Sequence, residues 1–97
     1  MSEGTVAAEI RRRLEDAFAP QRLEIVDESE RHRGHAGWRE GGETHFSLLI
    51  VSAAFEGVSR IERQRRIHGL LADLLAGRVH ALSVRALTPE EAARAGI

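Results

Sequence analysis

The first part of the chain has a helical pattern of apolar residues. Between residues 5 and 18, large apolar side chains recur every three or four positions, and most of the arginines fall outside this stripe. The stripe consists of Val6, Ile10, Leu14 and Phe18. Such spacing predicts an amphipathic helix over residues 5–18. Pro20 sets its end, because the residue before a proline is pushed out of the helical region.

Two later segments alternate apolar and polar residues, as strands do. In residues 21–28, Leu23 and Ile25 share one face. In residues 44–52, one face carries Phe46, Leu48 and Ile50, and the other carries His45, Ser47 and Leu49. A period of two predicts a β-strand in each segment, with the apolar face toward a core.

A second helix is predicted over residues 60–76, after a helical turn near residues 55–58. Ser59 followed by Glu62 is typical of a capping box, in which each side chain satisfies a backbone N–H of the first turn. The apolar stripe of this helix is Ile67, Leu70, Leu71, Leu74 and Leu75. Gly77 is the predicted end.

A third strand over residues 79–87 and a short terminal helix complete the pattern. His80, Leu82, Val84 and Ala86 share one face of the strand. Thr88, Pro89 and Glu91 supply the cap, first-turn proline and capping glutamate of the helix. The order is α-β-β-α-β-α, which predicts one α+β domain over residues 1–97, with helices on one face of a three-stranded sheet.

Composition restricts the class of protein. The chain has 97 residues, no cysteine and a formal net charge of −1. It therefore has no disulfides and no general attraction for nucleic acid or anionic membranes. No apolar run approaches the roughly 20 residues that span a bilayer, and the first residues lack the apolar core of a secretory signal. We expect a soluble cytoplasmic protein.

Histidines gather in one glycine-rich loop. His32, His35 and His45 lie within the stretch RHRGHAGWREGGETHF, residues 31–46. Imidazole is a good ligand for iron and zinc. A zinc site built on His32 and His35 with His45 or His80 is disfavoured, because structural zinc sites usually include cysteines. His80 has a second interpretation, as a half-buried core histidine satisfied by a hydrogen bond.

Arginines form the second cluster. Residues 59–66 read SRIERQRR and contain Arg60, Arg63, Arg65 and Arg66. Arginines at the start of a helix are able to hold phosphates of a nucleic acid. They serve equally well to meet an acidic partner or simply to be solvated.

Nothing in the sequence indicates an enzyme. There is no cysteine nucleophile, and no motif places a histidine base beside Ser29 or Ser52. The carboxylates have no spacing that nominates an acid–base pair, and no phosphate-binding loop opens a helix. We therefore expect a binding protein rather than a catalyst.

Four motifs, in order and across nearly the whole chain, resemble the BolA family. They are Asp27–Glu28–Ser29, Thr44–His45–Phe46, Phe55-x-Gly57-x-Ser59–Arg60 and Val79–His80–Ala81–Leu82. The resemblance implies the BolA fold, which is related to class II KH domains. It also implies a partnership with monothiol glutaredoxins in the handling of iron–sulfur clusters, and a link to transcriptional regulation.

The resemblance also implies how a chain without cysteine takes part in binding a cluster. Two imidazoles can replace two thiolates on one iron of a 2Fe-2S cluster. In the family's heterodimers the glutaredoxin supplies one cysteine, and bound glutathione supplies the other. By resemblance, His80 is one ligand and a loop histidine is the second. We favour His35 because Gly34 and Gly37 free the backbone around it, with His32 as the alternative.

The same resemblance frames the remaining expectations. The chain alone is expected to hold no cluster, and to be a monomer or weak homodimer. From its place in the histidine-rich loop, Trp38, the only tryptophan, is a candidate contact for the partner, with packing onto the sheet as an equal alternative. Ser59 is a second candidate contact for the partner. The alternative function is a nucleic-acid-binding regulator that uses the four arginines. Gln64 departs from the family, because many members have histidine between two arginines there, which puts any role of that histidine in doubt.

Overall fold

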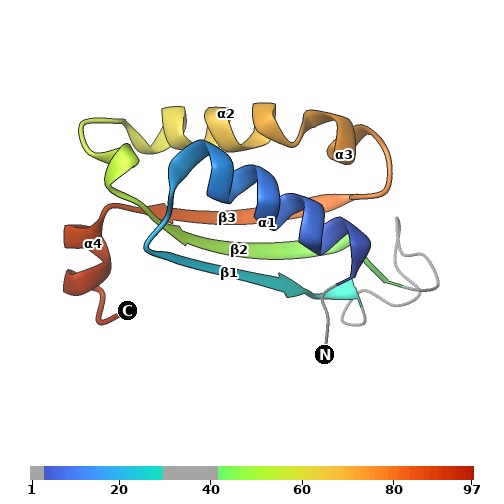
Figure 1. The fold of residues 1–97 in the computed structure, drawn as a ribbon, viewed down its shortest axis with the longest axis horizontal. Helices are drawn as coiled ribbons and strands as arrows, with labels where there is room; N and C mark the ends of the chain where they lie inside the picture. Colours follow the sequence, from blue (N-terminus) through green and yellow to red (C-terminus); the bar gives the residue numbers. More distant parts are fainter. Residues whose placement is uncertain (1–3, 30–41) are drawn as a thin grey trace.

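The computed structural model of the protein describes residues 4–29 and 42–97 (Figure 1). Its elements, in chain order, are α1 (Thr5–Phe18), β1 (Arg22–Asp27), β2 (His45–Val51), the 3-10 helix η2 (Ala53–Phe55), α2 (Arg60–Leu70), α3 (Ala72–Ala76), β3 (Ala81–Leu87) and α4 (Pro89–Arg94). The first helix lies where its pattern predicts, and each strand begins and ends within two residues of its predicted bounds. Local periodicity was therefore sufficient to locate these elements.

The three strands form one sheet in the order β1-β2-β3. β1 and β2 are antiparallel, with Leu23 opposite Ile50, whereas β2 and β3 are parallel, with His45 opposite Ala81. A parallel pair requires a crossover connection, here supplied by η2, α2 and α3. Because β1 runs opposite to β2 and β3, its C-terminal end lies at the same end of the sheet as the starts of β2 and β3 (Figure 1).

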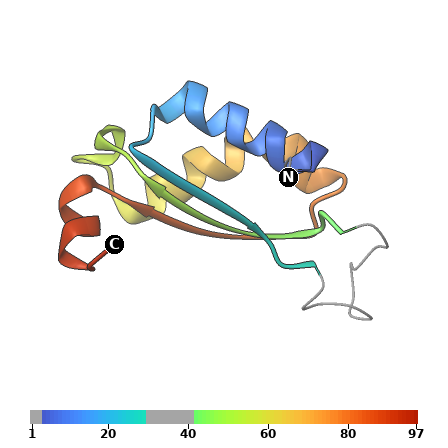
Figure 2. The same cartoon turned by 60° about the horizontal axis from the view of Figure 1, so that its bottom comes forward.

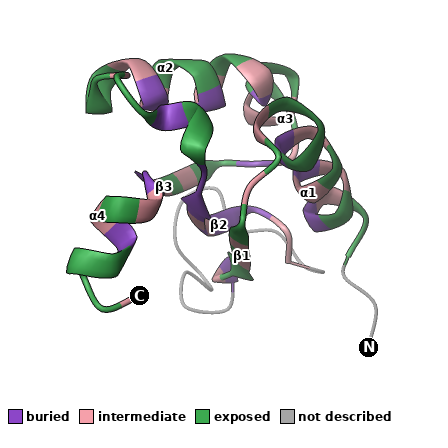
Figure 3. Ribbon diagram, turned by 60° about the vertical axis from the view of Figure 1, so that its left-hand side comes forward, coloured by how far each residue is buried: buried purple, intermediate pink, exposed green. Residues whose placement is uncertain are grey.

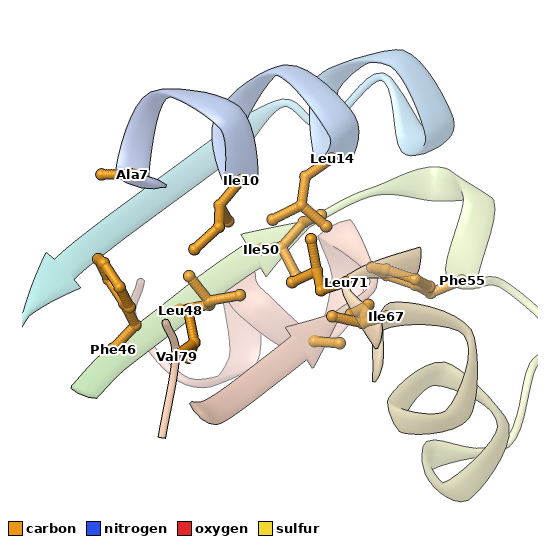
Figure 4. Packing of buried hydrophobic residues seen from close by; sticks show 11 residues of the cluster. Ala7, Ile10, Leu14, Phe46, Leu48, Ile50, Phe55, Ile67, Leu71 and Val79 are labelled. Atoms are coloured by element: carbon orange, nitrogen blue, oxygen red, sulfur yellow. The ribbon is translucent and has the colours of Figure 1, made fainter. Parts of the chain in front are cut away.

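One face of the sheet carries the main core. α1, α2 and α3 all lie on that face, and the other face is largely uncovered by described elements (Figure 2). Phe46, Leu48 and Ile50 alternate along β2 toward the helices, each 3% exposed or less. They pack with buried residues of the helices, including Ile10, Leu14 and Ile67 (Figure 4). Burial of one such side chain contributes about 1.5–3 kcal/mol, so this layer dominates the stability of the fold.

The predicted helix over residues 60–76 is divided into two. α2 ends at Leu70 and α3 begins at Ala72, with Leu71 between them at φ −107°, ψ 13° and 1% exposed. Arg13 of α1 holds the break: its guanidinium donates to the carbonyl of Leu70 at 3.1 Å and forms an ion pair with Asp73. The division keeps Leu71 in the core while a side chain from α1 satisfies the freed carbonyl. Gly77 ends α3 as predicted.

α4 covers part of the opposite face of the sheet. Its Ala92 packs with Val51 and Leu87, which alternate in their strands with Ile50 and Ala86 of the main core. Figure 3 shows this helix beside the end of the sheet, with one short buried stretch in an otherwise more exposed helix. Helices therefore cover one face along its length, and the terminal helix closes one end of the other.

Candidate metal and partner site

The candidate metal site lies at the end of the sheet where β1 ends and where β2 and β3 begin. β1 ends at Asp27, β2 starts at His45, and His80 comes immediately before β3. The backbone N–H groups of His80 and Ala81 donate to the carbonyl of Thr44 at 2.7 and 3.2 Å. These bonds bring His80 and His45 together although 34 residues separate them in the sequence.

His80 is exposed and held by its backbone. It lies outside β3, so it does not share the buried face with Leu82 and Val84 as the strand pattern predicted. The preceding residue, Val79, is 2% exposed, and its N–H donates to the carbonyl of Leu74 at 2.9 Å. The interpretation of His80 as a core histidine is therefore wrong. Its ring is presented to the surroundings from a fixed backbone.

His45 is the buried neighbour of His80. It is 5% exposed, and its ring centre lies 5.3 Å from that of His80 with an interplanar angle of 50°. Its Nδ1 is 2.8 Å from the hydroxyl oxygen of Thr44. As predicted, it points away from the apolar face that begins at Phe46, where it lines a shallow hollow with Glu28 and Ser83.

A network of buried polar groups supports this pair of histidines. The hydroxyl of Ser29 donates to Oδ1 of Asp27 at 2.5 Å and accepts from the N–H of Thr44 at 2.9 Å. Oδ2 of Asp27 accepts from the N–H of Glu43 at 2.9 Å. Burial alone would raise the pKa of Asp27, but the hydrogen bonds from Ser29 and Glu43 outweigh it and hold the pKa below its usual range. The carboxylate is thus a stable acceptor at the end of β1.

The residues that flank the histidine-rich loop are tied to the rest of the fold. The guanidinium of Arg78 donates to the carbonyl of Gly42, whose φ is +74°. The carboxylate of Glu43 accepts from the N–H groups of Val6 and Ala7 at 2.9 and 3.0 Å, at the start of α1. The loop is therefore anchored beside His45 and His80 at both of its ends. His32, His35 and Trp38 themselves lie outside the described residues.

The metal-binding side chains described at this end of the sheet would supply only part of the ligands of a metal ion. In residues 4–29 and 42–97, no three histidine, aspartate or glutamate side chains come together in a way that would hold a metal ion. The chain has no cysteine. A metal at His80 would take its other ligands from the loop or from a partner, and the chemistry on this side is that of neutral imidazole.

The arginine cluster lies toward the other end of the molecule, at the start of α2 (Figure 1). Arg65 is exposed, and the hydrogen bonds and ion pairs among the described residues do not include it. Arg66 pairs with Glu62 at 3.3 Å, and Arg60 pairs with Glu91 at 3.3 Å. All three residues are exposed, with 70% of the Arg60 side chain and 49% of the Arg66 side chain accessible, so they remain candidates for contact with phosphates.

Arg63 belongs to the interior instead. It is 6% exposed and donates to the carbonyls of Val58 and Ala86 at 2.9 and 3.1 Å. It also pairs with Glu91 at 2.6 Å and lies over the ring of Phe55. This side chain joins the start of α2 to β3 and α4, so we remove it from the candidate phosphate contacts.

Ser59 and Gln64 also serve the fold. The hydroxyl of Ser59 accepts from the N–H of Glu62 at 3.1 Å, but the Glu62 carboxylate pairs with Arg66, so the predicted capping box is only half formed. The amide of Gln64 donates to the carbonyl of Val84 at 2.9 Å on the outer edge of β3. At this position the side chain covers a strand edge, whatever role a histidine has there in other proteins.

Sequence reasoning did not link Ser29 and Thr44 to the histidines. Both residues lie in motifs that carry the resemblance, but the contact between them spans 15 positions of the sequence. One signal was available in the sequence: a polar residue, Ser29, follows the first predicted strand, and another, Thr44, stands at the start of the second. Short polar side chains at the ends of two adjacent strands often satisfy each other when they are buried.

Comparison with known proteins gives a consistent result. A family model described as BolA-like protein matches residues 14–91. Over 88 residues the chain is 49% identical to BolA-like protein 1 of Pongo abelii, which covers 91% of this chain and 61% of that relative. The chain thus spans about three fifths of the length of that protein. It is also 35% identical over 82 residues to the DNA-binding transcriptional regulator BolA of Vibrio cholerae, covering 84% of this chain and 74% of that one.

A solved structure confirms the predicted fold. The BolA domain of SufE1 from Arabidopsis thaliana superimposes with a TM-score of 0.82 at 46% identity, covering 93% of this chain and 99% of that one. The small α+β sheet with its helices is the common element. Of the helices in the described ranges, none is long and apolar enough to cross a membrane. The cytoplasmic location stays a prediction.

Proposed function

This chain belongs to the BolA-like protein family, and from that membership we propose that it is an adaptor that binds a monothiol glutaredoxin and shares a 2Fe-2S cluster with it. Its task would be iron–sulfur trafficking or iron sensing. His80 is one proposed ligand to iron, and His35 or His32 is the other. The glutaredoxin cysteine and glutathione would supply the thiolates.

One observation carries this proposal: an exposed His80 on a rigid backbone, beside the anchored ends of a loop that holds two more histidines. Imidazoles are suitable ligands for one iron of a 2Fe-2S cluster when thiolates hold the other. Since the chain has no cysteine, half of the coordination must come from outside it. This requirement explains why an adaptor of this kind would work only in a complex.

The test is to mix the chain with a monothiol glutaredoxin, glutathione, ferrous iron and sulfide. Visible absorption and circular dichroism are then recorded for the wild type and for His80→Ala, His35→Ala and His32→Ala. We expect a heterodimer spectrum that differs from that of the glutaredoxin alone, and that is lost with His80 and with one loop histidine. The loop variant that loses it identifies the second ligand.

His68→Ala is the matched control. Nδ1 of His68 lies 2.8 Å from the carbonyl of Gln64 within α2, away from the site. This variant should give the wild-type spectrum. If the wild type and His80→Ala give the same spectrum as the glutaredoxin alone, the adaptor proposal is wrong.

A second candidate function is nucleic-acid binding through Arg60, Arg65 and Arg66. It is favoured by the exposed arginines at the start of α2 and by similarity to a protein named as a DNA-binding transcriptional regulator. Phosphate contacts of this type give affinity that falls steeply with salt. Fluorescence anisotropy of a labelled duplex against salt concentration tests this function separately, because His80 lies at the other end of the molecule.

A further inference from the structure

The two outer edges of the sheet differ in how their backbone is covered. β1 and β3 are the edge strands (Figure 1). On β3, the carbonyl of Val84 accepts from the amide of Gln64 at 2.9 Å. The carbonyl of Ala86 accepts from the guanidinium of Arg63 at 3.1 Å. Side chains of α2 therefore satisfy the outer edge of β3, and an edge without such cover is a template for pairing with another strand.

The outer edge of β1 has no such cover among the residues that the structure describes. The N–H of Glu28 donates to the carbonyl of His45 at 2.7 Å, and the register between the two strands is constant. Hydrogen-bonded positions alternate in an antiparallel pair, so the even-numbered residues of β1 bond to β2. The odd-numbered ones, Leu23, Ile25 and Asp27, direct their N–H and C=O groups outward. No hydrogen bond from a described residue reaches these backbone groups.

We propose that a second copy of the chain pairs with this edge, β1 against β1 in antiparallel, and joins the two sheets into one of six strands. The two-fold axis passes through Ile25, which lies opposite Ile25 of the second copy. Leu23 then lies opposite Asp27, so the outward-facing groups exchange hydrogen bonds along the whole strand. Because the axis is perpendicular to the sheet, the helices of both copies lie on the same side.

The charges of β1 favour this register. Arg22, Glu24 and Val26 alternate with the core residues Leu23 and Ile25, so they lie on the uncovered face of the sheet. In the proposed register Glu24 lies opposite Val26 of the second copy. Sliding that copy by two residues one way places Glu24 opposite Glu24. Like charges directly opposite each other are destabilising, so this shift is disfavoured.

Glu28 excludes the shift in the other direction, because that shift places Glu28 opposite Glu24 of the second copy. In the proposed register Glu28 lies opposite Arg22 instead, and symmetry makes this pair of opposite charges twice. The Glu28 carboxylate also accepts from the hydroxyl of Ser47 at 2.6 Å. The two oxygens of a carboxylate accept several hydrogen bonds, so both contacts are compatible. Larger shifts pair only one end of the strand.

The pairing also shelters apolar surface that the single chain leaves open. Leu23 and Ile25 are only partly buried, and Val26 is 49% exposed. One short strand from each copy makes a small interface, and interfaces below about 1,200 Å² are typical of transient complexes. We therefore expect a weak dimer whose population rises with concentration.

Two substitutions at Val26 test the register in opposite directions. Val26→Lys places an ammonium opposite Glu24 of the second copy, whereas Val26→Glu places a second carboxylate there. Since symmetry repeats each contact, the dissociation constant should fall between about 2- and 30-fold in Val26→Lys and rise similarly in Val26→Glu. Sedimentation equilibrium of the free chain, without iron or a partner protein, measures it from about 10 µM to 1 mM, a range suited to weak complexes.

Ser83→Lys and Ser83→Glu are the matched controls. Ser83 is exposed on the same face of the sheet, but it lies on β3, with β2 between it and β1. These variants make the same changes of net charge as the Val26 pair. Both should have the dissociation constant of the wild type.

Amide hydrogen exchange of the wild type locates the interface without any substitution. The amides of Leu23 and Ile25 should exchange more slowly as the concentration rises. Those of Glu24 and Val26 bond to β2 in every state and serve as the internal reference. In a mixture of labelled and unlabelled chains, the α-proton of Glu24 should contact that of Val26 across the interface, as in a non-hydrogen-bonded antiparallel pair.

Three results would overturn the proposal. The first is a chain that stays monomeric up to 1 mM, in which case the open edge is left to a strand of another protein. The second is a dimer in which the Leu23 and Ile25 amides exchange as fast as in the monomer. The third is a dimer that Val26→Lys weakens or leaves unchanged, which would contradict the register.

Discussion

Arg63 and Arg65 are two positions apart in the same run of arginines, yet the fold uses them in different ways. The helical turn directs Arg63 into the junction of α2, β3 and α4, where it is 6% exposed, and leaves Arg65 exposed. The sequence grouped Arg63 with the other arginines and gave no sign that the carbonyls of Val58 and Ala86 accept hydrogen bonds from its guanidinium. Long-range backbone acceptors have no signature in a local pattern.

Methionine substitutions separate these two roles, because methionine keeps much of the aliphatic stem of arginine. Arg63→Met leaves two carbonyls without their donor, and should lower the free energy of unfolding by about 2–3 kcal/mol. Arg65→Met should change it by less than about 0.5 kcal/mol. Urea denaturation measures both, and equal effects would contradict the interior role of Arg63.

Glu91 makes the stability depend on acid. Hydrogen bonds from Arg63, and then from the N–H of Thr88, lower the pKa of Glu91 from 4.5 to about 2. A carboxyl with a lowered pKa in the folded state stabilises the fold fully above pH 4.5, and this contribution is lost as pH falls toward 2. In Glu91→Gln, stability should therefore fall less between pH 6 and pH 3 than in the wild type. The measurement is the urea midpoint of each protein at several pH values. If the midpoints of the wild type and of Glu91→Gln fall equally between pH 6 and pH 3, the Arg63–Glu91 pair does not make stability depend on pH in this way.

At the scale of elements, the helices and strands were predictable because their signals are local. Caps such as Thr88 with Glu91, and the alternation of Phe46, Leu48 and Ile50, lie within a few residues of what they control. The division between α2 and α3 was not predictable, because it depends on Arg13 reaching Leu70 across 57 positions. The leucine stripe continues through the break, so periodicity alone favoured one helix.

Because of the break between α2 and α3, two leucines of that stripe are buried to different extents and should contribute differently to stability. Leu71 is 1% exposed in the main core, whereas Leu75 is only partly buried. Leu71→Ala should cost about 2–5 kcal/mol, as removal of a fully buried leucine generally does, and Leu75→Ala clearly less. Thermal or urea unfolding gives the comparison. A larger loss for Leu75 would mean that the helix is continuous and rotated relative to the sheet.

Over the whole molecule, the two candidate surfaces lie at opposite ends of a body 39 Å long (Figure 1). The formal net charge is only −1, so the overall charge of the protein does not attract a charged partner to either surface. The sequence predicted both clusters but not their separation, which results from the parallel pairing of β2 with β3. This separation implies that variants at one end should leave the function of the other end intact.

If DNA binds to α2, the salt dependence of its affinity should give the number of phosphate contacts. Each phosphate contact contributes about −0.9 to the slope of log affinity against log salt. The double variant Arg65→Ala, Arg66→Ala should reduce the slope by about 2, while His80→Ala keeps the wild-type slope. Anisotropy titrations at several salt concentrations measure this. An unchanged slope in the double variant would exclude these arginines as phosphate contacts.

The anchoring of the loop ends has a consequence for how this fold can change over time. Ser29 on one side, and Gly42 with Glu43 on the other, are fixed by bonds to the sheet, to Arg78 and to α1. With both ends held, the length between them enters stability mainly through the entropy of closure, and doubling a flexible loop costs only about 0.6 kcal/mol. If the proposed site is right, insertions there would move the loop ligand relative to His80 while the sheet stays as it is. In that site, His80 would be conserved with the scaffold, and the position of the loop histidine would change with the length of the loop.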